Sequence, residues 1–379
     1  MIFDRRSRRG LFLTSVLWAT LAWLPVMPPG CFAADIDNIP QLQAAADKGF
    51  IPQEIELAAA YFTGKGVTQD VRMAAHWYER AAESGDPEAE NEIGFLYQTG
   101  VGVPADAARA LHWYQLAASS GYVKARVNLG VLYFWGIGVA KNHDLAARYF
   151  RDAFAKGSGA AASYLGDMYY FGIGVERDTA TAERWYTSGA KLHDPLASYD
   201  LGTLFSVAPD HAHDFAKASV LLRGAASDGY VPAMHSLGLL LIRHPELARS
   251  ANEARALIQD ASAAGSWRSS VVLGVFERDG REGAANPEAA YYDFRLAVLQ
   301  GGDEAGQMLG NDFAALEKKL SADQMTAIDE RAGNWHKEHP LALSFVYRSG
   351  GDFRRFPSLA RSMAENGIHA GLLIAPPPT

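Results

Sequence analysis

A glycine recurs every 36 residues along most of this chain. Seven glycines keep this interval without a slip, with Ala58 in the slot before them: Gly94, Gly130, Gly166, Gly202, Gly238, Gly274 and Gly310. A second series lies 27 residues further on in each unit, broken only at His193: Gly85, Gly121, Gly157, Gly229, Gly265 and Gly301. A fixed period of this length indicates a repeat array whose units pack only against their neighbours.

Each unit predicts two antiparallel helices. The first helix has apolar residues at helical spacing, such as Ile93, Leu96 and Tyr97, and the second carries an aromatic pair such as Trp77-Tyr78. Residues that can cap a helix precede the second helices: Asp70, Asp106, Asn142, Asp178, Asp214, Ser250 and Asn286. Asp86-Pro87 and Asp194-Pro195 predict capped starts of first helices.

The glycines predict close packing and tight turns. Glycine inside a helix costs about 1 kcal/mol relative to alanine, so we expect Gly94 and its equivalents where the second helix approaches most closely. Aromatic residues of the Trp113 type would then cover the gap. The segments 100–103, 136–139 and 172–175 each contain Gly-x-Gly-Val and predict a turn after the first helix.

These residues resemble the Sel1-like repeat, a relative of the tetratricopeptide repeat. One unit shows the pattern at Ala125, Leu129, Gly130, Tyr133, Gly136, Gly138, Val139, Ala146, Tyr149, Phe150, Ala153 and Gly157. Units five and six depart from the pattern, because they lack the Gly-x-Gly turn and the aromatic pair. The resemblance implies an all-α, right-handed α-solenoid of about eight 36-residue helix-turn-helix repeats with a C-terminal capping helix.

The expected organisation has five parts. Residues 1–33 are a signal peptide, 34–49 an N-terminal segment or cap, and 50–302 repeats one to seven. Residues 303–340 form a degenerate eighth repeat and the capping helix, which Ser321 and Gln324 open with capping-box spacing. Residues 341–379 are a C-terminal extension ending in a disordered, proline-rich tail.

The N-terminus has the features of an export signal. Four arginines at positions 5, 6, 8 and 9 precede an apolar run over 11–27, which is shorter than the about 20 residues of a membrane span. We therefore expect cleavage near Ala33 and a periplasmic or secreted mature chain without a transmembrane span. Sec and twin-arginine export both remain open, as does lipidation of Cys31.

Composition excludes several classes of protein. The formal net charge of -8 disfavours a nucleic-acid partner, which requires a basic face. A single cysteine excludes an intrachain disulfide and a cysteine zinc site. The Gly-x-Gly segments follow predicted helices and not a strand, lack the third glycine of a dinucleotide fingerprint, and recur in step with the repeats. We expect no cofactor, no metal and no catalytic residue, although His211 and His213 lie close together.

A partner-binding surface is predicted on the concave wall that the first helices build. The hypothesis names Phe134, Trp135, Tyr170 and Phe171, which lie four and five residues after the key glycines of adjacent units. Arg126, Asn128, Ser163 and Asp167 would supply a polar rim. The alternative is that the four aromatic rings pack between units.

The function expected from these features is that of a non-enzymatic, exported scaffold binding a protein or peptide. The resemblance implies roles in bacterial cell-envelope assembly, polysaccharide secretion or signalling regulation. The alternative is a cell-wall-active or β-lactam-binding enzyme of the same repeat family, although the disulfide-bridged helix pairs of those members are missing here.

Overall fold

The computed structural model describes residues 39–207, 212–281 and 283–338, and within these ranges it contains helices and no strand. The helices are α1 (Ile39–Asp47), α2 (Ile51–Thr63), α3 (Val71–Glu83), α4 (Pro87–Thr99), α5 (Ala107–Ser119), α6 (Val123–Trp135), α7 (His143–Ala155), α8 (Gly159–Phe171), α9 (Thr179–Ala190), α10 (Pro195–Val207), α11 (Phe215–Ser227), α12 (Val231–Arg243), the 3-10 helix η1 (Pro245–Leu247), α13 (Glu253–Ala263), α14 (Trp267–Asp279), α15 (Pro287–Leu316) and α16 (Ala322–Glu338).

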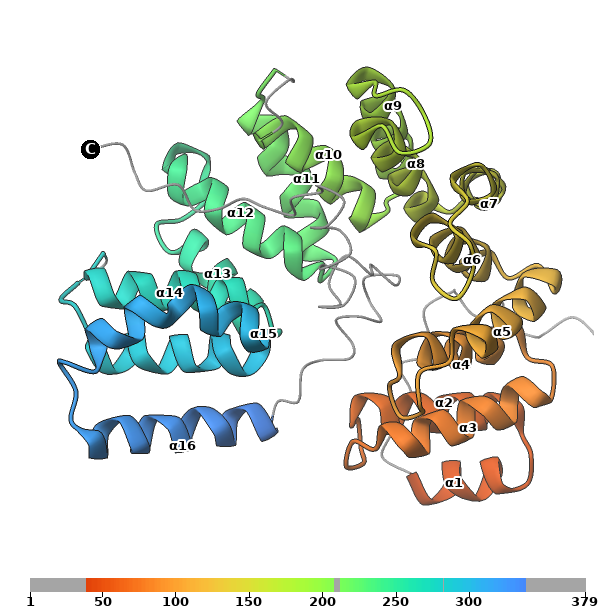
Figure 1. Cartoon of the computed structure of the whole chain (residues 1–379), viewed down its shortest axis with the longest axis horizontal. Helices are drawn as coiled ribbons and strands as arrows, with labels where there is room; N and C mark the ends of the chain where they lie inside the picture. The colour runs from red at the N-terminus through yellow and green to blue at the C-terminus, as the bar shows by residue number, and fades with distance from the viewer. Residues whose placement is uncertain (1–38, 208–211, 282, 339–379) are drawn as a thin grey trace, which may run out of the picture.

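The helices stack in pairs into a curved array. Figure 1 shows the chain passing from α1 through successive helix pairs to α16, with α4, α6 and α8 on the inside of the curve and α5, α7 and α9 outside. Each pair occupies one 36-residue unit. The predicted all-helical solenoid is therefore confirmed.

Capping residues start most of the helices. Asp70 accepts hydrogen bonds from the amides of Arg72 and Met73, and Asp86 caps α4 in the same way. The expected cap is confirmed at six of the seven sites that precede second helices: Asp70, Asp106, Asn142, Asp178, Asp214 and Asn286. Ser250 was expected as a cap and is not, because α13 begins later, at Glu253.

The Gly-x-Gly segments form tight turns that join neighbouring units. Gly100 and Gly102 both have φ of +74°, a left-handed conformation that other residues rarely adopt. Gly102 lies directly against the backbone of Val71 at the start of the preceding unit's second helix, where no side chain would fit. The turn therefore fixes how one repeat packs on the previous one.

From Gly94 to Gly274, the glycines of the 36-residue series lie where the two helices of a unit meet, as expected, whereas Gly310 has no neighbouring atom among the described residues within 4 Å of an added Cβ. The covering residue differs from the prediction: Tyr114 lies over Gly94, and Phe150 lies over Gly130. Trp113, the residue expected there, is only partly buried. The second member of the aromatic pair covers the glycine because it alone points at the first helix, about 100° of helical rotation away from its neighbour.

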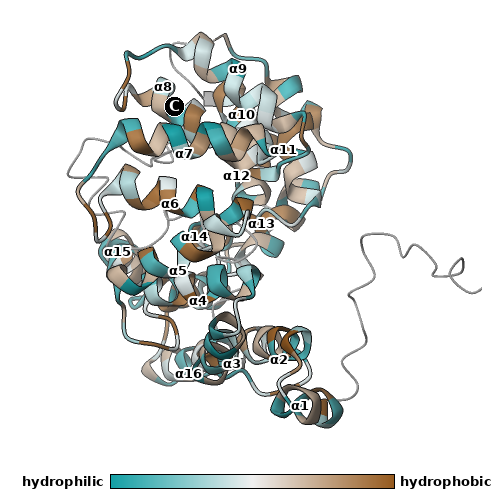
Figure 2. Cartoon of the chain, turned by 90° about the vertical axis from the view of Figure 1, so that its right-hand side faces the viewer, coloured by the Kyte–Doolittle hydropathy of each residue, from teal (hydrophilic) through white to brown (hydrophobic). Residues whose placement is uncertain are grey.

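Apolar side chains form a core that runs along the array. One cluster extends from Ala46 to Met168, and further clusters continue it through the later units. Viewed from the side (Figure 2), each helix carries hydrophilic as well as hydrophobic residues, as expected of helices with one face in a core.

Among the described helices, none is both long and apolar enough to cross a membrane.

The last repeat is closed by α16. Helix α15 changes direction at Gly302 (φ 58°, ψ -141°), so that it contains both the second helix of unit seven and the first helix of unit eight. Ser321 and Gln324 form the predicted capping box: the Gln324 amide donates to Ser321 Oγ, and the Ser321 amide donates to Gln324 Oε1. The proposed signal peptide with Cys31, residue His211 and the C-terminal extension 341–379 lie outside the described residues.

Candidate functional site

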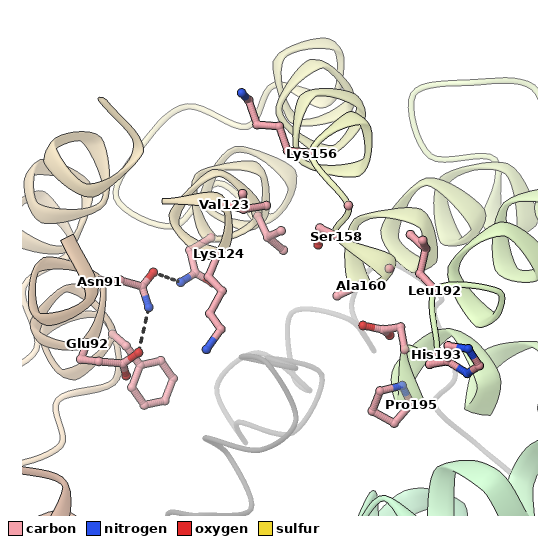
Figure 3. Close-up of a pocket in the computed structure, with 16 residues that line it drawn as sticks. Asn91, Glu92, Val123, Lys124, Lys156, Ser158, Ala160, Leu192, His193 and Pro195 are labelled. Atoms are coloured by element: carbon pink, nitrogen blue, oxygen red, sulfur yellow. Dashed lines mark hydrogen bonds between the residues drawn. The ribbon is translucent and has the colours of Figure 1, made fainter. Parts of the chain in front are cut away.

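A pocket of about 410 Å³ opens on the inner wall of the array, where several repeats converge. Residues of α4 form one side, and the first turns of α6 and α8 form the floor. The loop between α9 and α10, at residues 192–195, forms the other side (Figure 3). The pocket therefore spans four consecutive repeats, and no single repeat could build it.

Three polar side chains form a buried chain of hydrogen bonds in this pocket. Asn128 Nδ2 donates to Asn91 Oδ1 at 2.9 Å, and Asn91 Nδ2 donates to Glu92 Oε1 at 3.1 Å. The exposed fractions of Asn91, Glu92 and Asn128 are 4%, 5% and 6%. These hydrogen bonds supply partners to polar groups that would be costly to bury alone. They also orient the Glu92 carboxylate at the pocket wall.

The environment of Glu92 disfavours its charged form. Burial raises the pKa of Glu92 to about 7, and the negative charge of Glu88 adds to this effect. The ammonium of Lys124 and the hydrogen bond from Asn91 oppose the rise in pKa. Lys124 extends from α6 into the space between the two sides of the pocket (Figure 3). The carboxyl group therefore titrates near neutral pH.

The opposite side of the pocket contains an unusual backbone. His193 has φ of 57° and is the one described non-glycine residue with a positive φ. Asp194 follows it and caps α10, its Oδ1 accepting from the Ala197 amide at 3.0 Å. Burial raises the pKa of Asp194, against the hydrogen bonds that it accepts from backbone amides. This loop replaces the glycine found in equivalent units with a side chain at the pocket edge.

An apolar surface adjoins the polar wall. Phe95 and Val127 line the pocket and are 6% and 4% exposed, whereas Leu192 at the rim is 45% exposed. The pocket thus combines a buried carboxylate with an apolar lining, which suits a ligand that is polar at one end and apolar along its length.

The four aromatic residues predicted from the sequence lie at the other end of the first helices. Val123 begins α6 and Trp135 ends it, about 18 Å away at 1.5 Å per residue. Phe134 belongs to the core: it is 3% exposed, and its ring lies 6.3 Å from that of Phe150. Phe134 therefore has little surface left for a partner, because α6 turns this face toward α7.

The other three aromatic residues are more accessible. Trp135 and Tyr170 are half-buried, and Phe171 is 43% exposed, with its ring centre 4.8 Å from that of Tyr170. Arg177 lies over the Tyr170 ring at 5.6 Å and donates to the Tyr170 carbonyl. Contact of these rings with a partner stays a prediction.

The four residues expected to form a polar rim have different surroundings in the structure. Asn128 lines the pocket, but Arg126 pairs with Asp152 at 2.6 Å on α7. Ser163 and Asp167 are buried, and Tyr186 donates to Asp167 Oδ1. Sequence reasoning also missed Glu92. The available signal was register, because Glu92 and Asn128 are both polar and lie two residues before a key glycine in adjacent units.

In the part of the chain that the structure describes, no three His, Cys, Asp or Glu side chains are arranged to hold a metal ion.

Comparisons with known proteins place these repeats. The Sel1 repeat family model matches residues 54–86, 87–122, 123–158 and 159–194. The fold is similar to that of a protective antigen from uropathogenic Escherichia coli that displays an SLR fold. That structure is 24% identical with a TM-score of 0.54, and the match covers 82% of this chain and 66% of the antigen chain.

A second solved structure, a Sel1 repeat protein from Oxalobacter formigenes, is 27% identical with a TM-score of 0.48. The match covers 60% of this chain and 100% of that protein. No curated protein sequence matches this chain.

Proposed function

We propose that this chain, in which residues 54–194 match four Sel1 repeats, is a non-enzymatic, exported scaffold that binds a protein or peptide on its inner wall. Repeats of this kind generally mediate protein–protein interactions. The proposed setting is the bacterial cell envelope, in its assembly, in polysaccharide secretion or in the regulation of signalling. The basic N-terminal segment followed by a short apolar run supports export.

The inner-wall pocket carries the proposal for the binding surface. Polar side chains at a solenoid surface ordinarily point into water, yet Asn91, Glu92 and Asn128 are more than nine-tenths buried around an open space. A buried, oriented set of donors and acceptors costs stability that a binding partner recovers. Solenoids present such concave surfaces to extended partners.

Site-specific photo-crosslinking in the native host tests this function. A photoreactive residue at Leu192, at the pocket rim, should capture a defined partner that mass spectrometry identifies. The matched control is Arg148, which is exposed on the second helix α7, away from the pocket-lining residues. Capture of the same protein from both positions, or from neither, would contradict an inner-wall binding site.

The remaining parts of the proposal have their own tests. Intact-mass analysis of the exported protein should show a chain that begins near Ala34. Turnover of a β-lactam or of peptidoglycan by the purified chain would contradict the non-enzymatic role.

A further inference from the structure

Resting on the proposed function, we propose that the inner-wall pocket binds a lysine or arginine side chain of an extended partner segment. The cation lies against the Glu92 carboxylate, and the aliphatic stem lies along Phe95 and Val127. The proposal therefore assigns a chemistry to the partner: a flexible segment with one basic side chain at a fixed position.

The first argument is the unpaired charge of Glu92. Glu54, equally buried on α2, forms an ion pair with Arg80 at 2.9 Å. Glu92 accepts one hydrogen bond from Asn91 and has no cation within 4 Å among the described residues. A buried carboxylate without a cation is costly, and a basic side chain of the partner supplies what Arg80 supplies to Glu54.

The surrounding charge favours a cation over an anion. Helix α4 and its cap contribute Asp86, Glu88, Glu90 and Glu92, and α4 contains no lysine or arginine. Lys124 and Lys156 also line the pocket, and the ammonium of Lys124 partly offsets the charge of Glu92. Both lysine side chains are exposed, however, so water and salt weaken their charges. Glu92 is buried, and the interaction of its charge with a bound ion is therefore the stronger one.

The shape of the lining fits a long basic side chain. Phe95 and Val127 are buried at the pocket wall, and Leu192 extends the apolar surface to the rim. Lysine and arginine side chains bury their methylene stems against such surfaces while their charged ends reach a polar partner. A short cation, such as a metal ion, would leave this apolar surface unused.

The Asn128 side chain adds a contact to the main chain of the partner. Its Nδ2 donates to Asn91, whereas its Oδ1 has no hydrogen-bond donor among the described residues. This amide oxygen can accept a hydrogen bond from a backbone N–H of the partner. An extended segment presents such N–H groups, because it has no internal hydrogen bonds of its own.

A display library of random peptides, panned on the full chain, provides the probe. Enriched peptides should share one lysine or arginine. Replacing that residue in the synthetic peptide with norleucine, which keeps the stem and removes the charge, should weaken binding about 30-fold in calorimetry. Glu92→Gln should weaken binding of the original peptide similarly and should make the two peptides nearly equal in affinity.

Control variants separate binding from folding. Glu90→Gln changes the neighbouring acid, which does not line the pocket, and should weaken binding far less than Glu92→Gln. Melting curves report whether Glu92→Gln folds; if it does not, the comparison of lysine and norleucine peptides on the unaltered chain still decides.

Two outcomes would overturn the inference and are distinguishable. Enriched peptides without a basic residue, or acidic peptides whose affinity depends on Lys124, contradict the inference but leave an inner-wall binding function intact. The absence of any enriched peptide, together with failure of crosslinking at Leu192, contradicts the proposed function as well.

Discussion

The ring of Phe150 lies directly against Gly130 in the third repeat. A Cβ atom added to Gly130 would lie 2.5 Å from Cε1 and 2.7 Å from Cδ1 of this ring. Gly130 is helical, so the glycine is required by the space that Phe150 fills and not by backbone conformation. The same pairing of glycine and large side chain holds at six of the seven glycines in the 36-residue series, from Gly94 to Gly274. It sets how closely the two helices of those units approach.

Gly130→Ala should therefore destabilise the chain. The added methyl group must displace the Phe150 ring from a filled core, and overpacking of this kind costs about 1–3 kcal/mol. Urea denaturation followed by circular dichroism measures this loss. Gly310→Ala is the matched control, because nothing lies within 4 Å of the added Cβ at that member of the series. Alanine should stabilise the helix there by up to about 1 kcal/mol, and equal effects at the two sites would refute the packing explanation.

His193 occupies a backbone conformation that its equivalents fill with glycine. Its φ is 57°, and Gly85, Gly121 and Gly157 have φ of 83°, 93° and 91°. A non-glycine residue in the left-handed conformation costs about 1–2 kcal/mol. Glycine avoids this cost, but the entropy that it loses on folding offsets about half of the gain. His193→Gly should therefore raise the free energy of unfolding by about 0.5–1 kcal/mol. A decrease in thermal stability would contradict this account.

The sequence predicts the helix pairs well and their facing residues less well. The glycine periods and caps locate both helices of each unit. They do not show that Tyr114, rather than Trp113, covers Gly94, because adjacent aromatic residues are equally apolar and only the rotation of α5 distinguishes them. The rotation of α6 likewise determines that Phe134 faces the core.

The pocket was harder to predict because it joins residues of different repeats. Asn91 bonds to Asn128, which is 37 residues away, one more than the repeat. That offset comes from the way that α6 packs beside α4, which an alignment of the repeats in register cannot show. The left-handed His193 was visible only as a missing glycine.

An ion pair between the two helices of a unit is present in the first and third units but has no counterpart among the described residues of the second. Arg80 pairs with Glu54 in the first unit, and Arg126 pairs with Asp152 in the third. The corresponding residues of the second unit are Glu90 and Leu116, and Glu90 Oε2 is buried without a hydrogen-bond partner. Leu116→Arg should therefore stabilise the chain by about 1 kcal/mol near neutral pH, as a hydrogen bond to a charged group does.

The gain from Leu116→Arg should depend on pH. Burial, with Asp86 adding to it, raises the pKa of Glu90 above its ordinary value of 4.5. Ionised Glu90 therefore costs stability as pH rises above 4.5, and the arginine offsets this cost only where Glu90 is charged. Unfolding measured below that pH should show no gain. Leu116→Gln, which adds polarity without charge, should show little gain at any pH.

Glu92 should make the chain less stable as pH rises. Its folded pKa of about 7 exceeds the ordinary 4.5, so stability is full below 4.5 and falls until about 7. The groups that interact with it are Lys124, Asn91, Glu88, Tyr114 and Tyr122. Glu92→Gln removes the titration and should increase the free energy of unfolding by about 2–3 kcal/mol near pH 8. No difference between the two proteins at this pH would show that the carboxylate is not held in a low-dielectric site.

The three accessible aromatic residues at the other end of the wall can be tested apart from the core. Phe134→Ala should lower the melting temperature strongly, since emptying a buried phenylalanine site costs about 3–5 kcal/mol. Phe171→Ala removes a 43% exposed ring and should change stability by less than about 1 kcal/mol. If Phe171 anchors the partner, the same change should weaken binding about 30-fold.

The measurement uses the partner captured at Leu192, with calorimetric affinities and melting curves for each variant. Val220→Ala is the control, because Val220 is an exposed apolar residue (70%) on the second helix α11. Lost affinity with an unchanged melt for Phe171→Ala, but not for Val220→Ala, assigns both ends of α8 to one binding surface. Affinity unchanged by Phe171→Ala would confine binding to the Glu92 pocket and would leave Trp135 and Tyr170 to packing between repeats.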